Sequence, residues 1–498
     1  MSTSPPFGRL LIANRGEIAI RIIRACRELG ITPIAVRSDA DADALHVRAA
    51  DSSELIGPAA AAESYLSIEA VIDAARRSGA EAIHPGYGFL SENPAFARAV
   101  EEAGLVFVGP PPEVLEALGN KLAARRSAES VGVPIVPGTT VALGDDVSSV
   151  EEIGFPVMLK AAAGGGGRGM RRVGSAEELA PAIDSARREA MTAFGDGTIY
   201  VERMVAPARH VEVQLLGDRH GSLAVLGERD CSVQRRHQKL VEESPSPAVG
   251  SALREALFTS ARLVAETVDF HNAATVEFLV DDDGNHYFLE MNTRLQVEHG
   301  VTELVTGIDI VAWQIRVAAG ESLTSEVLQA SSRGHAIEVR LYAEDPYDSF
   351  RPTAGRVTAW RMSEGPGVRV DSGVEAGTEL RPEYDPLLAK LLVLADDRPA
   401  ALARLRRALD ETLIGGLQTD AGFLRWLVDD PAFASGRYDT SLIAERWRNG
   451  PALSEEELAL ASVAAVGARM GTAPTGSIRT TDAGSAWGRL ARREALRR

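Results

Sequence analysis

Short apolar runs and helically spaced apolar positions alternate along the first part of the chain. Residues 10–13 and 31–36 are apolar runs typical of buried strands. Between them, residues 17–29 place apolar side chains at helical spacing, and Gly30 follows as a C-cap. The same alternation predicts a helix over 68–77, a strand at 82–83, a helix over 95–102 and a strand over 105–108. We expect an open α/β domain with a mostly parallel sheet.

Beyond this domain the pattern predicts further units, so the expected fold class is α/β and α+β multidomain. Pro134, Pro137 and Gly138 mark a boundary. A chain of 498 residues is long enough for two to four domains. The expected division is an N-terminal α/β domain over 7–119, a linker over 120–133, a small mobile lid with a glycine flap over 134–207, a larger α+β domain over 208–448, and a helical and flexible tail over 449–498.

The clearest chemical signal is a pair of glutamates on two predicted neighbouring strands. A hairpin turn centred on Asp283–Gly284 sets Glu277 directly opposite Glu290. Opposed residues have Cβ atoms roughly 4.5–5.5 Å apart, so the two charges repel each other unless a cation binds them. Oxygen ligands of this kind favour Mg²⁺ or Mn²⁺. The alternative is a solvated strand face, which the apolar neighbours on both strands disfavour.

The residues that follow the second strand concentrate further polar groups. Within nine residues the chain sets Glu290, Asn292, Arg294 and Glu298. Two carboxylates, an amide and a guanidinium are poor material for a hydrophobic core. The combination suits a divalent metal together with an anionic reactant.

A run of four glycines predicts a phosphate-binding flap. The run lies between predicted strands over 155–160 and 170–173, and Lys160 precedes it. Glycine lets successive backbone N–H groups wrap an anion. Because no helix follows and no Gly-Lys-Ser/Thr ends the run, it is not a Walker A loop. A flexible linker has a similar composition, but the flanking strands and the lysine favour the flap.

Two other segments are candidate site loops. Residues 228–239 form a dense polar and basic cluster, which in so acidic a chain indicates an anion-binding pocket. A solvated basic loop, a buried Cys231 and a structural His237 are the alternatives. Residues 84–93 follow a short strand of the first domain, where open α/β sheets bind ligands. Taken alone, this second loop is equally a simple turn before a helix.

Composition narrows the class of protein. The net charge of −17 argues against a nucleic-acid or anionic-membrane partner. The two cysteines fit a reducing compartment without a disulfide framework or a zinc cluster. No secretory signal and no apolar run of about 18 residues is visible, so we expect a cytoplasmic protein. The first strand lacks a G-x-G-x-x-G turn, which disfavours a dinucleotide site.

Taken together, these blocks resemble biotin carboxylase, the ATP-grasp component of acyl-CoA carboxylases and of pyruvate carboxylase. The resemblance covers about residues 7–448 and rests on several blocks in a fixed order. They are 13–17 (ANRGE), 84–93 (HPGYGFLSEN), the glycine run, 229–239 (RDCSVQRRHQK), 290–299 (EMNTRLQVEH), 334–340 (GHAIEVR), 350–355 (FRPTAG) and 384–390 (YDPLLAK).

The resemblance implies an activity and a role for each matched residue. Members phosphorylate bicarbonate with ATP to carboxyphosphate, and the CO₂ released adds to N1 of biotin. It implies that Glu277, Glu290 and Asn292 hold Mg²⁺ or Mn²⁺, and that Glu298 deprotonates bicarbonate. Arg340 would stabilise the biotin enolate. The remaining implied contacts are Lys121, Lys160, Gly164, Gly165, Gly166, Gly167 and His237 for phosphates, Glu202, His210 and Gln234 for adenine and ribose, and Lys239, Arg294, Gln296 and Val297 for bicarbonate.

Two departures from the family pattern affect what the resemblance implies. Residues 161–163 are alanines where many members have serine and a fifth glycine, and we expect ATP binding to survive this change. The chain also has no Ala-Met-Lys-Met carrier motif. Biotin would therefore arrive on a separate carrier protein, or the chain would be part of a longer polypeptide. The implied partners are a biotin carboxyl carrier, a carboxyltransferase and a second copy in a homodimer, with a place in fatty acid metabolism.

Two competing functions differ in chemistry. Another ATP-grasp ligase, such as a carbamoyl-phosphate synthase or a glycinamide ribonucleotide synthetase, is disfavoured by the loop at 84–93 and by the pair Glu298 and Arg340. A catalytically silent scaffold for a carboxylase complex is disfavoured because every matched catalytic position is filled.

Overall fold

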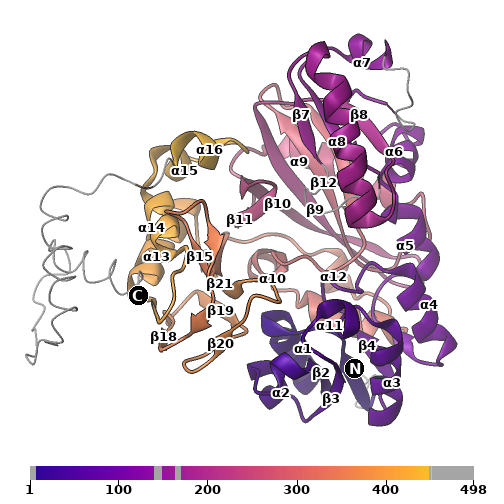
Figure 1. The fold of residues 1–498 in the computed structure, drawn as a ribbon, viewed down its shortest axis with the longest axis vertical. Helices are drawn as coiled ribbons and strands as arrows, with labels where there is room; N and C mark the ends of the chain where they lie inside the picture. The colour runs from indigo at the N-terminus through magenta and orange to yellow at the C-terminus, as the bar shows by residue number, and fades with distance from the viewer. Residues whose placement is uncertain (1–6, 140–147, 163–169, 448–449, 451–498) are drawn as a thin grey trace, which may run out of the picture.

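The computed structural model describes residues 7–139, 148–162, 170–447 and 450 (Figure 1). Three sheets of three or more strands organise these residues: a parallel sheet near the N-terminus, a small three-stranded sheet, and a long antiparallel sheet; three two-stranded sheets accompany them. The glycine run and, apart from Gly450, the predicted tail over 449–498 lie outside the described residues. Among the described helices, none combines the length and the apolar character that a bilayer-spanning segment needs.

The first domain is the predicted open α/β unit. Its five strands are all parallel, in the order β3-β2-β1-β4-β5. Every predicted strand and helix of this domain is present, with ends within two residues of the prediction. The elements are β1 (Arg9–Ile12), α1 (Gly16–Glu28), β2 (Thr32–Ser38), η1 (Asp39–Asp41), α2 (Leu45–Ala49), β3 (Ser52–Gly57), η2 (Ala61–Glu63), α3 (Ile68–Ser78), β4 (Ala82–His84), α4 (Pro94–Glu102) and β5 (Val106–Phe107).

Helical spacing explains how the helices of this domain pack. In α1, Ile18, Ile22 and Cys26 recur on one face and are buried. In α3, Ser67 accepts a hydrogen bond from the Ala70 amide and so caps the first turn. The carboxyl ends of β1 and β4 leave the loops 13–15 and 85–93 at the same edge of the sheet, where such folds bind ligands.

The predicted linker over 120–133 is mostly helical. Helices α5 (Pro112–Gly119) and α6 (Lys121–Ser130) follow one another, separated by Asn120. The Asn120 side chain accepts a hydrogen bond from the Ala123 amide and starts α6. The linker is therefore an ordered element that fixes the position of Lys121.

A small sheet with helices occupies most of the residues predicted to form a lid, at the top of Figure 1. Its strands run in the order β7-β6-β8. Apolar side chains of this sheet pack against those of α8 and form a hydrophobic core. The strands predicted over 155–160 and 170–173 are confirmed as β6 and β7. The elements are α7 (Ser148–Ile153), β6 (Val157–Ala161), β7 (Arg171–Val173), α8 (Ala176–Phe194) and β8 (Ile199–Arg203).

The long sheet carries most of the polar residues considered below. Its eight strands run antiparallel in the order β13-β12-β9-β10-β11-β14-β21-β19. They are β9 (Ala208–Gly217), β10 (Leu223–Arg235), β11 (Gln238–Ser244), β12 (Asn272–Asp281), β13 (His286–Asn292), β14 (His335–Tyr342), β19 (Val368–Ser372) and β21 (Leu387–Ala395). Because one sheet runs from β13 to β19, segments a hundred residues apart share a single rigid frame.

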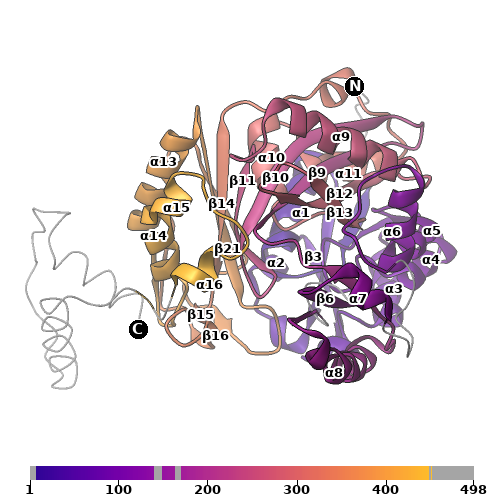
Figure 2. The ribbon, with the colours of Figure 1, turned by 90° about the horizontal axis from the view of Figure 1, so that it is seen from above.

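Helices cover this sheet from both sides. Seen from above, α13 and α14 form a layer outside β14 and β21 (Figure 2). On the other face, α10 packs against β10, β11, β14 and β21. The remaining elements are α9 (Ser251–Ala265), α10 (His299–Thr306), α11 (Ile310–Ala318), α12 (Ser325–Leu328), β15 (Glu344–Asp345), β16 (Arg351–Pro352), β17 (Gly355–Arg356), β18 (Ala359–Arg361), β20 (Glu379–Leu380), α13 (Arg398–Glu411), β22 (Leu413–Gly415), α14 (Ala421–Asp429), α15 (Pro431–Ala434) and α16 (Leu442–Arg446).

Candidate active site

Glu277 on β12 and Glu290 on β13 lie directly opposite each other, as the sequence predicts. The route to this register differs from the prediction. Nearer the turn, Val280 pairs with His286, one residue away from the register of a turn centred on Asp283–Gly284. A β-bulge next to Glu277 then restores its opposition to Glu290. The predicted pair was right, whereas the assumption of an unbroken ladder was wrong.

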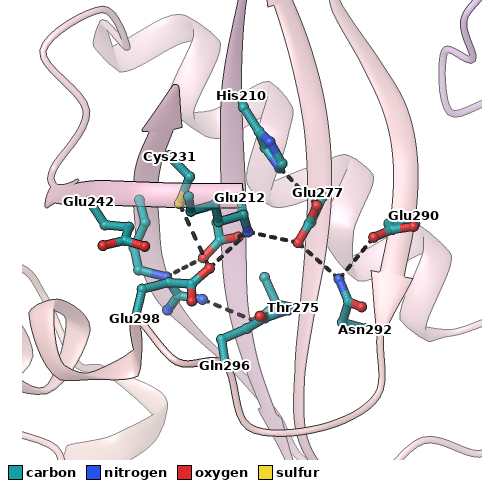
Figure 3. Close-up of polar contacts among 12 residues, drawn as sticks. His210, Glu212, Cys231, Glu242, Thr275, Glu277, Glu290, Asn292, Gln296 and Glu298 are labelled. Atoms are coloured by element: carbon teal, nitrogen blue, oxygen red, sulfur yellow. Dashed lines mark hydrogen bonds and ion pairs between the residues drawn. The ribbon is translucent and has the colours of Figure 1, made fainter. Parts of the chain in front are cut away.

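The two glutamates and Asn292 form the oxygen-rich group predicted for a divalent metal (Figure 3). Asn292 Nδ2 donates to Glu277 Oε1 at 2.9 Å and to Glu290 Oε1 at 3.4 Å. Lys121, at the start of α6, forms an ion pair with Glu290. Two carboxylates and an amide on adjacent strands fit Mg²⁺ or Mn²⁺, which prefer hard oxygen ligands.

Glu277 is held ionised by two basic neighbours. His210 on β9 lies with Nε2 2.8 Å from Glu277 Oε2, and Lys239 Nζ lies 2.9 Å from Oε1. Burial alone would raise the pKa of Glu277, but Lys239 and His210 outweigh it and hold the pKa well below its usual range. A carboxylate that stays ionised is the form that binds a cation.

Lys239, on β11, is the centre of the cluster. Its ammonium lies 2.5 Å from Glu212, 2.9 Å from Glu277 and 2.8 Å from Glu298. Burial lowers the pKa of Lys239, yet the three carboxylates together raise it well above the ordinary value. The lysine therefore remains protonated, and its single positive charge lies among the three carboxylates.

Glu298 lies between two cations at the start of α10. Its Oε1 accepts from Lys239, and its Oε2 accepts from Arg340 Nη2 at 2.9 Å. Arg340 also donates through Nε to Glu242 Oε1 at 2.7 Å. Burial would raise the pKa of Glu298, but Lys239, Arg340 and Arg229 hold it well below the usual range. In this state the carboxylate is ionised and ready to accept a proton, but weakly basic.

Arg294 links the segment after β13 to the first domain. Its Nε donates to Glu92 Oε2 at 2.8 Å, its Nη1 to Gln296 Oε1 at 3.0 Å and its Nη2 to Asn292 Oδ1 at 3.2 Å. The buried Nε2 of Gln296 has no hydrogen-bond partner among the described residues. An unpaired buried donor beside a guanidinium suits an anionic ligand with oxygen acceptors. The loop at 84–93 thus contributes to the site, as the sequence suggests.

The residues predicted to contact the nucleotide lie partly on the small sheet and partly on the elements beside it. Lys160 on β6 forms an ion pair with Glu202 on β8, and Arg125 Nη1 donates to the same carboxylate at 2.7 Å. Burial and the charge of Lys160 lower the pKa of Lys121 to about 8. The two lysines are therefore close enough to repel each other, which favours an anion between them.

The polar and basic cluster over 228–239 belongs to a hairpin of β10 and β11, which is buried over 228–233 and exposed at its tip, Arg236 and His237. Gln234 Nε2 lies 3.3 Å from His210 Nδ1. His237, at the tip, has a positive φ of 67°, and burial, then Lys160 and His210, lower its pKa. Cys231 is buried, and burial raises the pKa of its thiol. The tip therefore brings a neutral histidine towards Lys160 on the lid.

The structure brings together every described residue predicted for the site, and adds several that the sequence reasoning missed. Glu212, Glu242 and Glu92 bind predicted residues directly, and Arg229 donates through Nε to Glu212. A signal for Glu212 exists, because His210, Glu212 and Gln214 alternate with apolar residues along β9. No such signal marks Glu242, whose role follows from the distant strand β14 pairing with β11.

These features define the class of protein: a small sheet with helices beside a long antiparallel sheet that carries two opposed glutamates is the arrangement of an ATP-grasp ligase. Family models agree and cover most of the chain. The biotin carboxylase N-terminal domain matches residues 6–115, the carbamoyl-phosphate synthase L chain ATP-binding domain matches 120–326, and the biotin carboxylase C-terminal domain matches 338–445.

Similar proteins narrow the class to one family. Biotin carboxylase of Halalkalibacterium halodurans is 50% identical over 88% of this chain and 97% of its own length. A crystal structure of a Campylobacter jejuni biotin carboxylase–beta-gamma-ATP complex has a TM-score of 0.86 at 45% identity, covering 88% of this chain and 99% of that one. The biotin carboxylase domain dimer of Hydrogenobacter thermophilus 2-oxoglutarate carboxylase, with MgADP, ADP and bicarbonate, has a TM-score of 0.87 at 43% identity, covering 90% and 99%. The chain belongs to the biotin carboxylase family and is an ATP-dependent ligase.

Proposed function

We propose that this chain carboxylates N1 of biotin, presented on a carrier protein, with bicarbonate and ATP through carboxyphosphate. The observation that supports this most directly is the placement of Glu298 between Lys239 and Arg340, beside the glutamate pair of the hairpin. One group of charges suits the phosphates, and the adjacent group suits a small oxyanion. The reaction would be the first half of an acyl-CoA carboxylase cycle.

The nucleotide would bind between the lid and the long sheet. Glu277, Glu290 and Asn292 would hold Mg²⁺ or Mn²⁺, which neutralises phosphate charge in phosphoryl transfer. Lys121 and Lys160 would give up Glu290 and Glu202 and contact the phosphates. The backbone of residues 164–167 and His237 would contribute further phosphate contacts, and Glu202, His210 and Gln234 would lie near adenine and ribose.

Bicarbonate would bind beside Glu298, against Lys239, Arg294, Gln296 and Val297. The Gln296 Nε2 donor is free to bind an oxygen of this ion. A second anion beside Glu298 would draw on the same cations that now hold its pKa down, and its pKa would rise. Substrate binding would therefore strengthen the base at the moment when bicarbonate must lose its proton to become a better nucleophile.

Arg340 would stabilise the enolate of biotin. Its guanidinium is buried between Glu242 and Glu298, and those carboxylates, with others nearby, raise its pKa well above the ordinary value despite burial. A group that never loses its charge suits the deprotonated ureido oxygen of biotin. The lid would keep water away from carboxyphosphate, whose hydrolysis would waste ATP.

The proposed partners follow from the chemistry. A biotin carboxyl carrier would deliver biotin, and a carboxyltransferase would use the carboxylated product. We also propose a homodimer, because the Hydrogenobacter domain is described as one. A cytoplasmic location remains a prediction from the sequence.

The test is an assay of ATP cleavage by the full chain with free biotin, with and without bicarbonate. We expect cleavage that depends on both, together with ¹⁴C-carboxybiotin from labelled bicarbonate. Production of carbamoyl phosphate from ammonia, or ATP cleavage indifferent to biotin, would favour another ATP-grasp ligase instead.

A further inference from the structure

Lysine is rare in this chain, and every lysine side chain is largely buried. Of the 53 lysine and arginine residues, only four are lysines: Lys121, Lys160, Lys239 and Lys390. Each of their side chains is at most 20% exposed. The first three belong to the site described above. A planar, bulkier guanidinium cannot replace a compact ammonium at a tight buried position. The fourth lysine, Lys390, therefore marks a position that requires a lysine.

Lys390, on β21, is completely buried. Its Nζ donates to the backbone carbonyl of Val297 at 2.6 Å. The same Nζ lies 3.5 Å from Glu17 Oε1 and 4.0 Å from Asp371 Oδ2. A buried ammonium costs several kcal/mol of desolvation unless charges and hydrogen bonds compensate it. Here the Val297 carbonyl, Glu17 and Asp371 compensate the charge of Lys390. The first of these contacts is to the residue that directly precedes Glu298, the proposed base.

The Glu17 contact extends this link to the first domain. The hydroxyl of Tyr87, in the loop 84–93, donates to Glu17 Oε1, the oxygen nearest to Lys390. The start of α1 also packs backbone to backbone against the end of β19, since a Cβ on Gly373 would lie 2.7 Å from the Glu17 amide nitrogen. Lys390 therefore joins three segments that are far apart in sequence: the turn at Val297, the start of α1, and the loop that carries Tyr87.

We infer that Lys390 is a positioning residue that sets the wall of the bicarbonate and biotin pocket. Its ammonium holds the Val297 carbonyl, and through Glu17 it holds the Tyr87 hydroxyl, so that this wall is formed before either substrate binds. The inference rests on the proposed function, which assigns Val297 to bicarbonate. A merely structural lysine would neutralise Glu17 and Asp371 and leave substrate affinities alone, which makes the two roles separable.

The test compares Lys390→Met with the double variant Lys390→Met, Glu17→Gln. The single change leaves Glu17 short of a cation and is expected to destabilise the fold. The double variant removes that unpaired carboxylate while the Val297 carbonyl still lacks its donor. In the folded double variant we expect the KM for bicarbonate and for free biotin to rise about ten-fold, which corresponds to the loss of roughly one hydrogen bond. The KM for MgATP is expected to stay unchanged.

Two further variants complete the design. Arg24→Met removes an exposed cation that lies 3.5 Å from Asp371 at the same junction, and it is expected to change none of the three KM values. Tyr87→Phe leaves the lysine in place and removes only the hydroxyl, so it is expected to raise the biotin and bicarbonate KM values by a smaller factor. As a readout without turnover, bicarbonate in the presence of MgADP should raise the thermal midpoint of the unmodified chain more than that of the double variant.

The outcomes are distinct. Unchanged bicarbonate and biotin KM values in the folded double variant, or an equal rise in all three KM values, would overturn the role of Lys390. An unmodified chain that cleaves ATP without regard to bicarbonate would instead overturn the proposed function, and this is seen before any variant is made.

Discussion

Lys121 and Glu290 form an ion pair that joins the start of α6 to the end of β13. Each is expected to bind a different part of a metal–nucleotide complex, the lysine a phosphate and the glutamate the metal. Glu277 is paired in the same way, with Lys239 and His210. The protein's own basic side chains therefore balance the glutamate pair, and under the proposed function the binding of MgATP would exchange one set of ion pairs for another.

The first prediction concerns Glu290→Gln. Losing one of two opposed carboxylates weakens the metal site, and we expect ATP cleavage to fall by about 10²–10³. The Mg²⁺ concentration for half-maximal rate should rise, as measured by titrating Mg²⁺ at fixed ATP. Asp283→Asn, in the exposed turn of the same hairpin, is the control and should match the unmodified chain. Equal effects of the two changes would remove Glu290 from the metal site.

The second prediction concerns Glu298→Gln. The amide keeps the shape of the side chain and cannot accept the bicarbonate proton, so carboxylation of biotin is expected to fall by about 10²–10⁴. Binding of ADP, measured by calorimetry, should remain near that of the unmodified chain. Glu326→Gln, an exposed change on α12, is expected to have no effect. Normal turnover by the Glu298 variant would show that the base lies elsewhere.

The third prediction is a dependence of stability on pH at Glu338. This glutamate is fully buried, faces Glu242 across β14 and β11, and has no hydrogen-bond partner for either oxygen among the described residues. Burial raises its pKa well above the usual value; Lys390 opposes this shift and Glu242 adds to it. The folded state keeps a proton that the unfolded chain releases above about pH 4.3, so the free energy of unfolding should fall as pH rises beyond that value.

Glu338→Gln mimics the protonated form and should flatten this fall. The measurement is the urea midpoint between pH 5 and 8 for the two chains. Because burial also raises the pKa of Glu242 to about 7, some slope should persist near neutral pH in the variant. Identical slopes in the two chains would mean that Glu338 is ionised when folded.

The fourth prediction has the opposite sign and concerns Glu243. Its carboxylate accepts from His335 Nε2 at 2.6 Å, from Arg398 Nε at 2.7 Å and from the Tyr438 hydroxyl. Burial would raise its pKa, but His335 and Arg398 lower it to about 2. The stability that it contributes is present above about pH 4.3 and is lost as pH falls towards 2.

Removing this carboxylate tests the cluster. Glu243→Gln leaves the Arg398 guanidinium without its carboxylate and should cost about 3–5 kcal/mol at neutral pH, with a smaller loss on acidification than in the unmodified chain. Denaturant titrations at pH 7 and pH 3.5 measure both quantities. A cost below about 1 kcal/mol would place the cluster among weak surface ion pairs.

Local periodicity explains what could be predicted from the sequence. The helices and strands of the first domain follow from spacing within a dozen residues, and the opposed pair Glu277 and Glu290 follows from one hairpin. The bulge beside Glu277 was beyond such reasoning, because a bulge changes the register without changing the hydrophobic pattern in a recognisable way.

Long-range strand pairing explains what was missed. Glu242 and Glu243 are adjacent in sequence, yet one binds Arg340 in the site and the other binds His335 and Arg398 on the opposite face of β11. Alternation along the strand separates them, but only the pairing with β14 shows which one reaches the site. The same holds for Lys390, whose partners come from three distant segments.

The scarcity of lysine has a practical consequence for chemical labelling. An acylating reagent would meet only four side-chain amines. The pKa of Lys121 is lowered to about 8, whereas the pKa values of Lys239 and Lys390 are raised, so Lys121 is uncharged at neutral pH more often than either. Acylation should accordingly concentrate at the proposed nucleotide pocket, and ATP should protect Lys121 from it. For the same reason the exterior offers almost no lysine for enzymatic acetylation, so regulation by that modification would act on the reaction centre itself.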